Sequence, residues 1–228
     1  MGRRLLKQRE VEALVRAMMK LYPASRSELM FSNRFELVCA VALSAQTTDK
    51  AVNLVTPALF SAYPTPEAMK DAPLEHLEEL LSTIGLYRNK AKHLKKMAQQ
   101  LVDDFNGQVP GSREDLVTLA GVGRKTANVV LSNGFGVPAF AVDTHIERVS
   151  KRMKFVPASS TVRQVEDRMT RLLPEDLWTD AHHSILLFGR YQCTARNHDH
   201  KACLKRLAEV LKENPDASEA IDYLGSIE

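Results

Sequence analysis

The sequence predicts an all-α protein, and three observations lead to that fold class. Near the start of the chain, five apolar residues lie at positions i, i+3, i+4, i+7 and i+8, the spacing of one helix face: Val11, Leu14, Val15, Met18 and Met19. Signals for a helix start recur in Thr-Pro-Glu at 65–67 and Ser-Arg-Glu-Asp at 112–115. The apolar–polar alternation that marks a strand is almost absent. We therefore expect about ten or more helices in 228 residues.

Further helices are expected along the chain. Residues 88–105 form one long basic helix, which ends at Asn106-Gly107 because these residues favour the left-handed backbone that closes a helix. Residues 175–190 form another, and Asn214-Pro215 begins a short last helix. The basic side chains of the 88–105 helix either face solvent or contact a phosphate backbone; they are Arg88, Lys90, Lys92, Lys95 and Lys96.

The net charge of +3 is unevenly distributed along the chain. Residues 213–228 contain five acidic residues and no lysine or arginine, so residues 1–212 carry 31 basic and 23 acidic side chains, a net charge of +8. This distribution fits a polyanionic partner, and it equally fits a solvated surface with an acidic end.

Several classes of protein are disfavoured by simple features. No run of about 18 apolar residues exists, so we expect no membrane-spanning segment. The first residues, MGRRLLKQREVEALV, lack the apolar core and cleavage site of a secretory signal. The three cysteines, Cys39, Cys193 and Cys203, are too few and too scattered for a disulfide framework, which favours a reducing compartment.

Residues 114–134, which include LAGVGRKTANVV at 119–130, predict a helix, a tight turn and a second helix. Gly121 and Gly123 supply the backbone freedom that the turn needs. The exposed N–H groups of such a turn can bind a phosphate oxygen, directly or through a bridging cation. An ordinary αα-hairpin is the alternative. Lys125, in the first turn of the second helix, lies where the helix dipole disfavours a protonated amine, so it is a candidate nucleophile or else a solvated surface lysine.

The segment AVDTHIERVSKRM at 141–153 contains the second candidate residue, Asp143. Thr144 and Glu147 have the spacing of a capping box, ahead of a helix with Ile146 and Val149 on one face. Asp143 would then lie at the mouth of a helix N-terminus, where an anion is favoured. The alternative is that Asp143 serves only as a cap.

Together these segments resemble endonuclease III, a family of DNA glycosylases. LAGVGRKTANVVLSNGFG is similar to its helix-hairpin-helix, and AVDTHIERVSKR is similar to the segment with its catalytic aspartate. LSAQTTDKAVN at 43–53 and TIGLYRNKAKHL at 83–94 resemble the two segments that enter the DNA duplex. The likeness continues through HHSILLFGRYQCTAR at 182–196, so it covers most of the chain from about residue 30.

The resemblance implies two helical domains that flank a DNA-binding cleft. A six-helix barrel with the helix-hairpin-helix would occupy residues 27–137. Residues 1–26 and 138–228 would form the second domain, with the catalytic aspartate and a degenerate cluster loop. Lys125 and Asp143 would act as the catalytic pair.

The resemblance also implies a set of DNA-binding residues. Gln46 would fill the space of the flipped base and Leu86 would wedge the opposite strand; without the resemblance, Gln46 is equally a helix C-terminus and Leu86 a core residue. The hairpin backbone would hold a phosphate, with a monovalent cation as a possible bridge. The expected DNA contacts are Gln46, Leu86, Gly121, Val122, Gly123, Arg124, Thr144, His145 and Arg196.

The implied activity is base-excision repair. A glycosylase of this kind removes oxidised pyrimidines from double-stranded DNA, and its lysine Schiff base then cleaves the abasic strand by β-elimination. We expect a monomer in the cytoplasm, associated with the nucleoid. The alternatives are a monofunctional glycosylase, against which Lys125 argues, and a helix-hairpin-helix protein that binds DNA without catalysis.

The sequence departs from the family at the C-terminal cluster motif. Many members hold a [4Fe–4S] cluster with cysteines spaced C-x6-C-x2-C-x5-C, where this chain has Cys193, His200, Cys203 and Glu209. Because such a cluster needs four ligands, normally thiolates, we predict no cluster and no metal. Zinc held by Cys193, Cys203 and either His198 or His200 is a less favoured alternative. We favour an apolar helix face instead, made by Leu204, Leu207, Val210 and Leu211 and packed with the short last helix.

Overall fold

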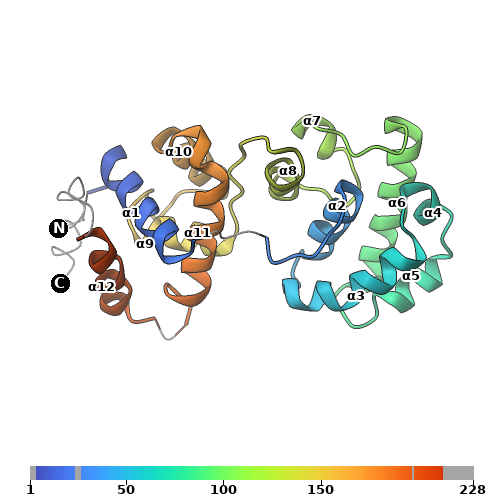
Figure 1. Cartoon of the computed structure of the whole chain (residues 1–228), viewed down its shortest axis with the longest axis horizontal. Coiled ribbons are helices and arrows are strands. Elements are labelled where there is room, and N and C mark those ends of the chain that lie inside the picture. The colour runs from blue at the N-terminus through green and yellow to red at the C-terminus, as the bar shows by residue number, and fades with distance from the viewer. Residues whose placement is uncertain (1–3, 24–26, 197, 213–228) are drawn as a thin grey trace. The chain divides into compact units, whose positions relative to one another are not determined.

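The computed structural model describes residues 4–23, 27–196 and 198–212. Within these residues the all-α prediction is confirmed: the structure contains twelve α-helices, one π-helix and one 3-10 helix, and no strand (Figure 1). The chain divides into two compact units, one of Ser27–Val137 and one that combines Met1–Arg26 with Pro138–Glu228. None of the described helices is both long and apolar enough to cross a membrane.

The Ser27–Val137 unit consists of helices joined by short loops. Their bounds are α2 Arg34–Leu43, α3 Asp49–Ala62, α4 Pro66–Lys70, α5 Leu74–Leu80, α6 Tyr87–Phe105, α7 Arg113–Leu116, α8 Arg124–Val130 and the π-helix Leu131–Phe135. The long α6 packs against α4 and α5, and α2 packs against α8. The helix predicted over 88–105 is therefore a central support of this unit, and it ends at Asn106 and Gly107, both with positive φ.

The second unit brings the start of the chain against its C-terminal half. It contains α1 Gln8–Leu21, α9 Thr144–Arg152, α10 Val162–Leu172, the 3-10 turn Glu175–Leu177, α11 Trp178–Tyr191 and α12 His200–Leu211. Four of the five residues of the apolar face predicted for α1 are fully buried, at Val11, Leu14, Val15 and Met18, and the fifth, Met19, is partly buried. This face packs against α11 and α12 around a core that includes Phe140, Phe155 and Phe188. The short helix expected after Asn214 lies outside the described residues.

Helix caps follow the sequence signals at two positions and depart from them at a third. Thr65 and Ser112 cap α4 and α7 by accepting bonds from Ala68 N and Asp115 N, at 3.3 and 3.1 Å. The capping box predicted for Thr144 and Glu147 is wrong, because Asp143 has the extended backbone of the cap, with φ −109° and ψ −176°. Both neighbouring side chains can cap a helix, and only the backbone conformation decides between them.

The Glu147 carboxylate is engaged elsewhere on α9. It binds Lys151 Nζ at 2.6 Å, four residues further along the helix. Thr144 is the exposed first residue of α9. The start of α9 thus depends on Asp143 alone among the predicted capping residues.

The basic side chains of α6 do not form one uniform surface. Lys90 is only 6% exposed, and Lys95 donates to the Ala72 carbonyl oxygen at 2.5 Å. Arg88, Lys92 and Lys96 are exposed. Five basic residues of α6 were expected to face solvent or phosphate. Two of them, Lys90 and Lys95, instead make contacts within the fold.

Candidate active site and DNA-binding elements

The hairpin, which we define as residues 113–130, is shaped by its first glycine. Gly121 has φ +79°, in the left-handed region, and a Cβ there would lie 3.2 Å from the Cβ of His93. Glycine is therefore favoured at this position both by backbone conformation and by the close approach of α6. Gly123 has an extended backbone and begins α8, where it has no side chain to cap the first turn.

The turn of the hairpin is fastened to α6 by one side-chain amide. Gln100 Nε2 donates to the Thr118 carbonyl oxygen at 2.9 Å, and Gln100 Oε1 accepts from Ala120 N at 2.8 Å. Val122, only 5% exposed, anchors the same turn from within. Sequence analysis missed Gln100, because a residue 18 or 20 positions away leaves no local signal.

These attachments leave the turn and the first residues of α8 accessible to solvent. Gly121, Gly123 and Lys125 are exposed, and Arg124 is half-buried. Lys125 is the second residue of α8, in the turn whose backbone N–H groups have no partner within the helix. The hairpin therefore presents backbone donors and an amine on one short, fixed segment.

Two of the predicted DNA-binding residues have a strained backbone. Gln46 and Leu86 have φ values of 55° and 59°, in the left-handed region that side chains other than glycine rarely adopt. Gln46 is exposed, and Leu86 is 56% exposed, which excludes the interpretation of Leu86 as a core residue. Strain of this kind costs about 1–2 kcal/mol for a residue with a Cβ. In both loops, the backbone conformation that exposes the side chain is strained and therefore lowers stability.

The loops that contain Gln46 and Leu86 are linked by Lys90. The Lys90 ammonium donates to Thr47 Oγ1 at 2.5 Å, next to Gln46, while Lys90 N donates to Leu86 O at 3.0 Å in the first turn of α6. Burial lowers the pKa of Lys90, because the charged form loses hydration. A lysine expected on the helix surface is thus a buried connection between two exposed loops.

Asp143 begins α9 from the second unit. Its Oδ1 accepts bonds from His145 N at 2.9 Å and Ile146 N at 2.8 Å, and the side chain is half-buried. The preceding residues are almost fully buried, and Ala141 O is bonded to the ring of His182 at 2.8 Å. The carboxylate therefore stands on a rigid support, and both amide bonds use the same oxygen.

The next turn of α9 is held by a close approach of α11. A Cβ at Gly189 would lie 3.0 Å from the Cβ of His145 and 3.3 Å from its carbonyl oxygen, so only glycine fits without displacement. Arg148 connects the same elements: its Nη2 lies 3.1 Å from His145 Nδ1 and donates to Gly189 O at 2.7 Å. The segment 182–196, which resembles the family, therefore contains Gly189, whose lack of a side chain allows the close approach to His145.

The structure distributes the predicted site residues over both units. Gln46, Leu86 and the hairpin with Lys125 belong to Ser27–Val137, and Asp143, Thr144, His145 and Arg196 belong to the other unit. Arg196 is exposed in the loop after α11, where its carbonyl oxygen accepts a bond from Thr194 Oγ1 at 2.8 Å.

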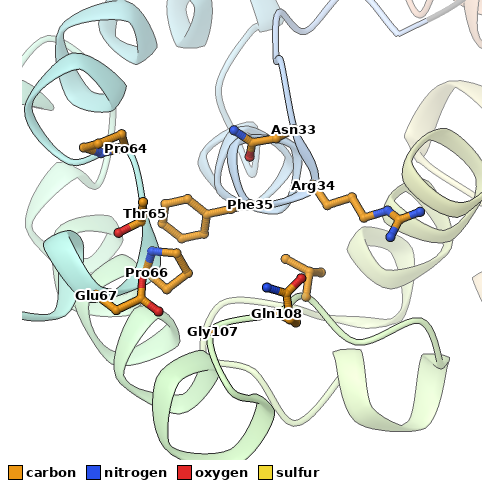
Figure 2. Close-up of a pocket in the computed structure, with 10 residues that line it drawn as sticks. Asn33, Arg34, Phe35, Pro64, Thr65, Pro66, Glu67, Gly107 and Gln108 are labelled. Atoms are coloured by element: carbon orange, nitrogen blue, oxygen red, sulfur yellow. The ribbon is translucent and has the colours of Figure 1, made fainter.

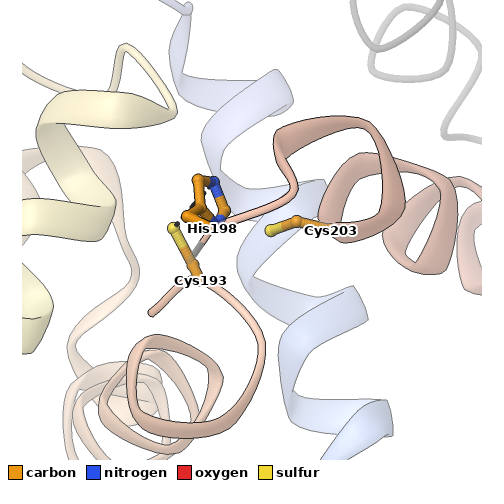
Figure 3. Close-up of side chains that lie close together, drawn as sticks. All are labelled: Cys193, His198 and Cys203. Atoms are coloured by element: carbon orange, nitrogen blue, oxygen red, sulfur yellow. Dashed lines mark hydrogen bonds between the residues drawn. The ribbon is translucent and has the colours of Figure 1, made fainter. Parts of the chain in front are cut away.

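Three potential metal ligands converge between α11 and α12. One ligand atom each from Cys193, His198 and Cys203 lies within 4.8 Å of the other two (Figure 3). Both cysteines are buried and His198 is half-buried. A hydrogen bond from the Cys203 thiol, aided by Arg152, holds the pKa of Cys193 well below its usual value, and the pKa of Cys203 is raised in turn.

The same residues do not fit the iron–sulfur cluster of the family motif. A cubane cluster held by thiolates needs four of them, and the whole chain has three cysteines, of which Cys39 lies buried in the other unit. Glu209, at the fourth motif position, is exposed and pairs with Arg206 at 3.6 Å. The third motif residue, His200, has a side chain outside the described part of the structure.

A surface pocket of about 500 Å³ lies elsewhere in the Ser27–Val137 unit (Figure 2). It is lined by residues 33–35, 64–67 and 107–109, at the starts of α2 and α4 and just after α6. None of the predicted site residues lines it. The candidate site is therefore defined by the exposed loops and helix starts, and this pocket is separate from them.

Comparison with known proteins identifies the family. The family model described as "HhH-GPD superfamily base excision DNA repair protein" matches residues 39–175, which include the hairpin, Lys125 and Asp143. The chain belongs to the HhH-GPD superfamily. Among HhH-GPD relatives, endonuclease III of Bacillus subtilis (strain 168) is 48% identical over 85% of this chain and 88% of its own length. Endonuclease III of Escherichia coli (strain K12) is 45% identical over 80% and 86%.

Solved structures agree with this assignment to the HhH-GPD superfamily. A trapped endonuclease III–DNA covalent intermediate matches with a TM-score of 0.85 and 45% identity, over 92% of this chain and 99% of the other. A non-covalent endonuclease III–DNA complex matches with a TM-score of 0.85 and 43% identity, over 96% and 100%. A thermostable thymine-DNA glycosylase, at 21% identity and a TM-score of 0.76, shares the fold.

Proposed function

We propose that this protein is a bifunctional DNA glycosylase and AP lyase of base-excision repair, which removes oxidised pyrimidines such as thymine glycol from double-stranded DNA. Its family and its endonuclease III relatives support the glycosylase and lyase activities. The observation that carries the bifunctional mechanism is the exposed Lys125 at the start of α8, behind the glycine turn. One solved relative forms a covalent intermediate with DNA, and such an intermediate requires a nucleophile.

The chemistry follows from an amine and a carboxylate that act on the same nucleotide. The neutral amine of Lys125 attacks C1′, the nitrogen gives up a proton, and the bond from C1′ to the base breaks as the base leaves with a proton. The bond from C1′ to the ring oxygen O4′ then breaks, O4′ takes up a proton, and C1′ and the lysine nitrogen remain joined as a protonated Schiff base. The imine acidifies the C2′ proton. Removal of that proton breaks the C3′–O bond, so the strand is cut on the 3′ side of the lesion. Water then hydrolyses the imine and frees the lysine.

Asp143 has the geometry to assist these steps. Its Oδ1 accepts both amide bonds at the start of α9, which leaves Oδ2 to face the substrate. A carboxylate there stabilises the positive charge that develops on the sugar and accepts the proton of the attacking amine. Because the helix start holds the side chain in place, the carboxylate loses little orientational freedom when DNA binds.

DNA recognition is assigned to the exposed loops. A glycosylase reaches its target only after the nucleotide has left the duplex, which costs a few kcal/mol. We assign Gln46 to the vacated space and Leu86 to the opposite strand, because both side chains are exposed on strained backbones. The hairpin backbone from Gly121 to Arg124 binds a phosphate, with a monovalent cation as a possible bridge. Thr144, His145 and Arg196 complete the contacts.

The protein is expected to work without an iron–sulfur cluster and as a monomer. The cluster residues of the family are not all present, and the two remaining cysteines are built into the core of their unit. The chemistry above uses only Lys125 and Asp143, so no step depends on iron.

Borohydride trapping on a duplex with one abasic site tests the proposal. Borohydride reduces the imine to a stable amine, so wild type gives a covalent protein–DNA adduct and Lys125→Gln gives none. Lys96→Gln, which changes an exposed lysine of α6, is the matched control and keeps the adduct. An adduct of wild-type yield from Lys125→Gln would overturn the assignment.

The same assay separates the two alternatives. Release of thymine glycol by wild type without any adduct identifies a monofunctional glycosylase. Salt-sensitive DNA binding without base release or adduct identifies a non-catalytic DNA-binding protein. Substrate preference is measured with duplexes that contain thymine glycol or 8-oxoguanine, and we expect faster release of thymine glycol.

A further inference from the structure

The Cys193, His198 and Cys203 side chains approach the spacing of a tetrahedral metal site. With Zn–S bonds of about 2.3 Å and Zn–N bonds of about 2.0 Å, two sulfurs on one Zn²⁺ lie about 3.8 Å apart and a sulfur and a nitrogen about 3.5 Å apart. Cys193 Sγ lies 3.9 Å from His198 Nε2, and the three ligand atoms are all within 4.8 Å of one another. Changes of no more than about 1.3 Å in the distances between the ligand atoms bring them to zinc-binding spacing.

The backbone around these ligands is fixed independently of any metal. Cys193 N donates to Phe188 O at 2.7 Å at the end of α11. Asp199 caps α12 by accepting from Ala202 N at 3.1 Å, and Cys203 N donates to Asp199 O at 3.2 Å. Two separate helix ends therefore bring the ligands together, and Figure 3 shows their side chains directed toward one another. Little conformational entropy remains to be lost when an ion binds.

Arg152 supplies the kind of outer contact that metal–thiolate sites use. Its Nη1 lies 3.6 Å from Cys193 Sγ and donates to the Thr194 carbonyl oxygen at 2.6 Å. A donor aimed at a bound sulfur orients it and offsets part of its negative charge. Two thiolates balance the charge of one divalent cation, so the guanidinium adds a single positive charge to the site.

We propose, contrary to the expectation from the sequence that no metal is bound, that Cys193, His198 and Cys203 bind a single Zn²⁺ ion, with a water molecule as the fourth ligand. Two sulfurs and one imidazole nitrogen suit zinc, and they are too few for an iron–sulfur cluster. The ion joins the end of α11 to the start of α12 and thereby stabilises the packing of α12 on α1. The zinc proposal does not rest on the proposed function. Zinc binding is measured without DNA, so either proposal can fail while the other holds.

Metal analysis of the full-length protein is the direct test. Protein purified from zinc-supplemented medium without a metal-binding tag is expected to hold about one Zn²⁺ per chain, because the three ligands form a single site. His198→Gln and Cys203→Ser are expected to lose most of that zinc. Cys39→Ala, which changes the buried cysteine of the other unit, is the matched control and retains it. His198 is half-buried, so its variant remains foldable even where Cys203→Ser does not.

Cobalt replacement gives a second, spectroscopic readout. Co²⁺ bound by two thiolates in a tetrahedral site gives intense visible d–d bands and a near-ultraviolet sulfur-to-metal band, and His198→Gln should lose both. A chelator should also lower the Tm of wild type and leave that of His198→Gln unchanged. The proposal is overturned if wild type holds no zinc after incubation with excess Zn²⁺. It is equally overturned by a Cys193–Cys203 disulfide that persists after treatment with a thiol reductant, or by about four irons per chain with brown absorbance.

Discussion

The hairpin and the cysteine segment, which we define as residues 193–211, use buried and exposed positions in opposite ways. In the hairpin, Val122 is buried as an anchor, while Gly121, Gly123 and Lys125 are exposed. In the cysteine segment, the potential ligands Cys193 and Cys203 are buried together with Leu204, Leu207 and Leu211. Most of the exposed positions there are charged, and those of α12 include Lys201, Lys205, Arg206 and Glu209.

This contrast indicates how differently the two regions depend on their motif residues. The hairpin holds its shape through Val122 and Gln100, so we expect the exposed Lys125 to contribute little to stability. The cysteine segment is held by apolar burial, so it remains folded where the family's cluster residues are replaced. Changes in the hairpin and at Asp143 should therefore alter activity, and changes in the cysteine segment should alter stability.

The largest expected effect is on catalysis. Asp143→Asn should lower the rate of base release by about 10²-fold or more, because the carboxylate charge is lost while the capping bond to the α9 amides is kept. Single-turnover kinetics on a thymine-glycol duplex measure the rate, and thermal unfolding should show little change in Tm. Asp199→Asn makes the same substitution at the cap of α12 and is the control. An equal loss of rate in both variants would break the comparison.

The next effect is on stability. Leu207 is 0% exposed in the core of its unit, so Leu207→Ala should reduce the free energy of unfolding by about 2–5 kcal/mol. Val117→Ala in the hairpin, where the side chain is 42% exposed, should cost less than about 0.5 kcal/mol. Urea unfolding measures both. If the Val117 variant is the less stable of the two, apolar burial does not distinguish the regions.

A smaller effect is expected at Leu86, where one substitution should lower activity without lowering stability. Leu86→Gly removes left-handed backbone strain of about 1–2 kcal/mol, which stabilises the fold. Glycine also makes the unfolded chain more flexible, which costs about 0.5–1 kcal/mol of stability. Its unfolding free energy should stay constant or rise by up to about 1.5 kcal/mol, while base release slows because the wedge is lost. Asn106→Gly makes the corresponding change at the other end of α6, where asparagine already tolerates the left-handed backbone, and should leave activity unchanged. A Leu86→Gly variant with full activity would remove Leu86 from the DNA contacts.

The smallest effect is a pH dependence that originates on α11. Burial lowers the pKa of His183 below its usual 6.5, an effect that Asp180 partly opposes. The unfolded chain therefore binds this proton more tightly, so stability falls as the pH drops from the unfolded pKa through the folded one. His183→Gln should show a smaller loss of stability between pH 8 and pH 5, and His93→Gln, at an exposed histidine, should match wild type. Equal losses in all three proteins would remove His183 as a cause.

The parts of the site that were predictable depend on local interactions. The caps at Thr65 and Ser112 and the end of α6 each involve side chains and backbone groups within a few residues, so their signals lie in short stretches of sequence. The glycine turn and the position of Lys125 are local in the same sense. Asp143 and Thr144 could not be ranked, because both are capping residues and only the backbone of the folded chain distinguishes them.

Other features depend on segments that are far apart in sequence. Lys90 contacts Thr47 across 43 residues, and Arg152 reaches Thr194 across 42. The family motif drew attention to His200 and Glu209, whereas in the folded chain Glu209 is exposed and His198 lies beside Cys193 and Cys203. Spacing along a chain does not determine which side chains meet when helix ends converge.

The sequence by itself determined the all-α class, the glycine turn with its lysine, and the loss of two cluster cysteines, because helix periodicity, capping and residue identity are properties of short segments. Tertiary structure alone decided that Gln46 and Leu86 are presented on strained backbones, that Gln100 and Lys90 fix the loops of the first unit, and that Cys193, His198 and Cys203 converge. These features arise from the packing of whole helices, whose energy is shared among many distant contacts.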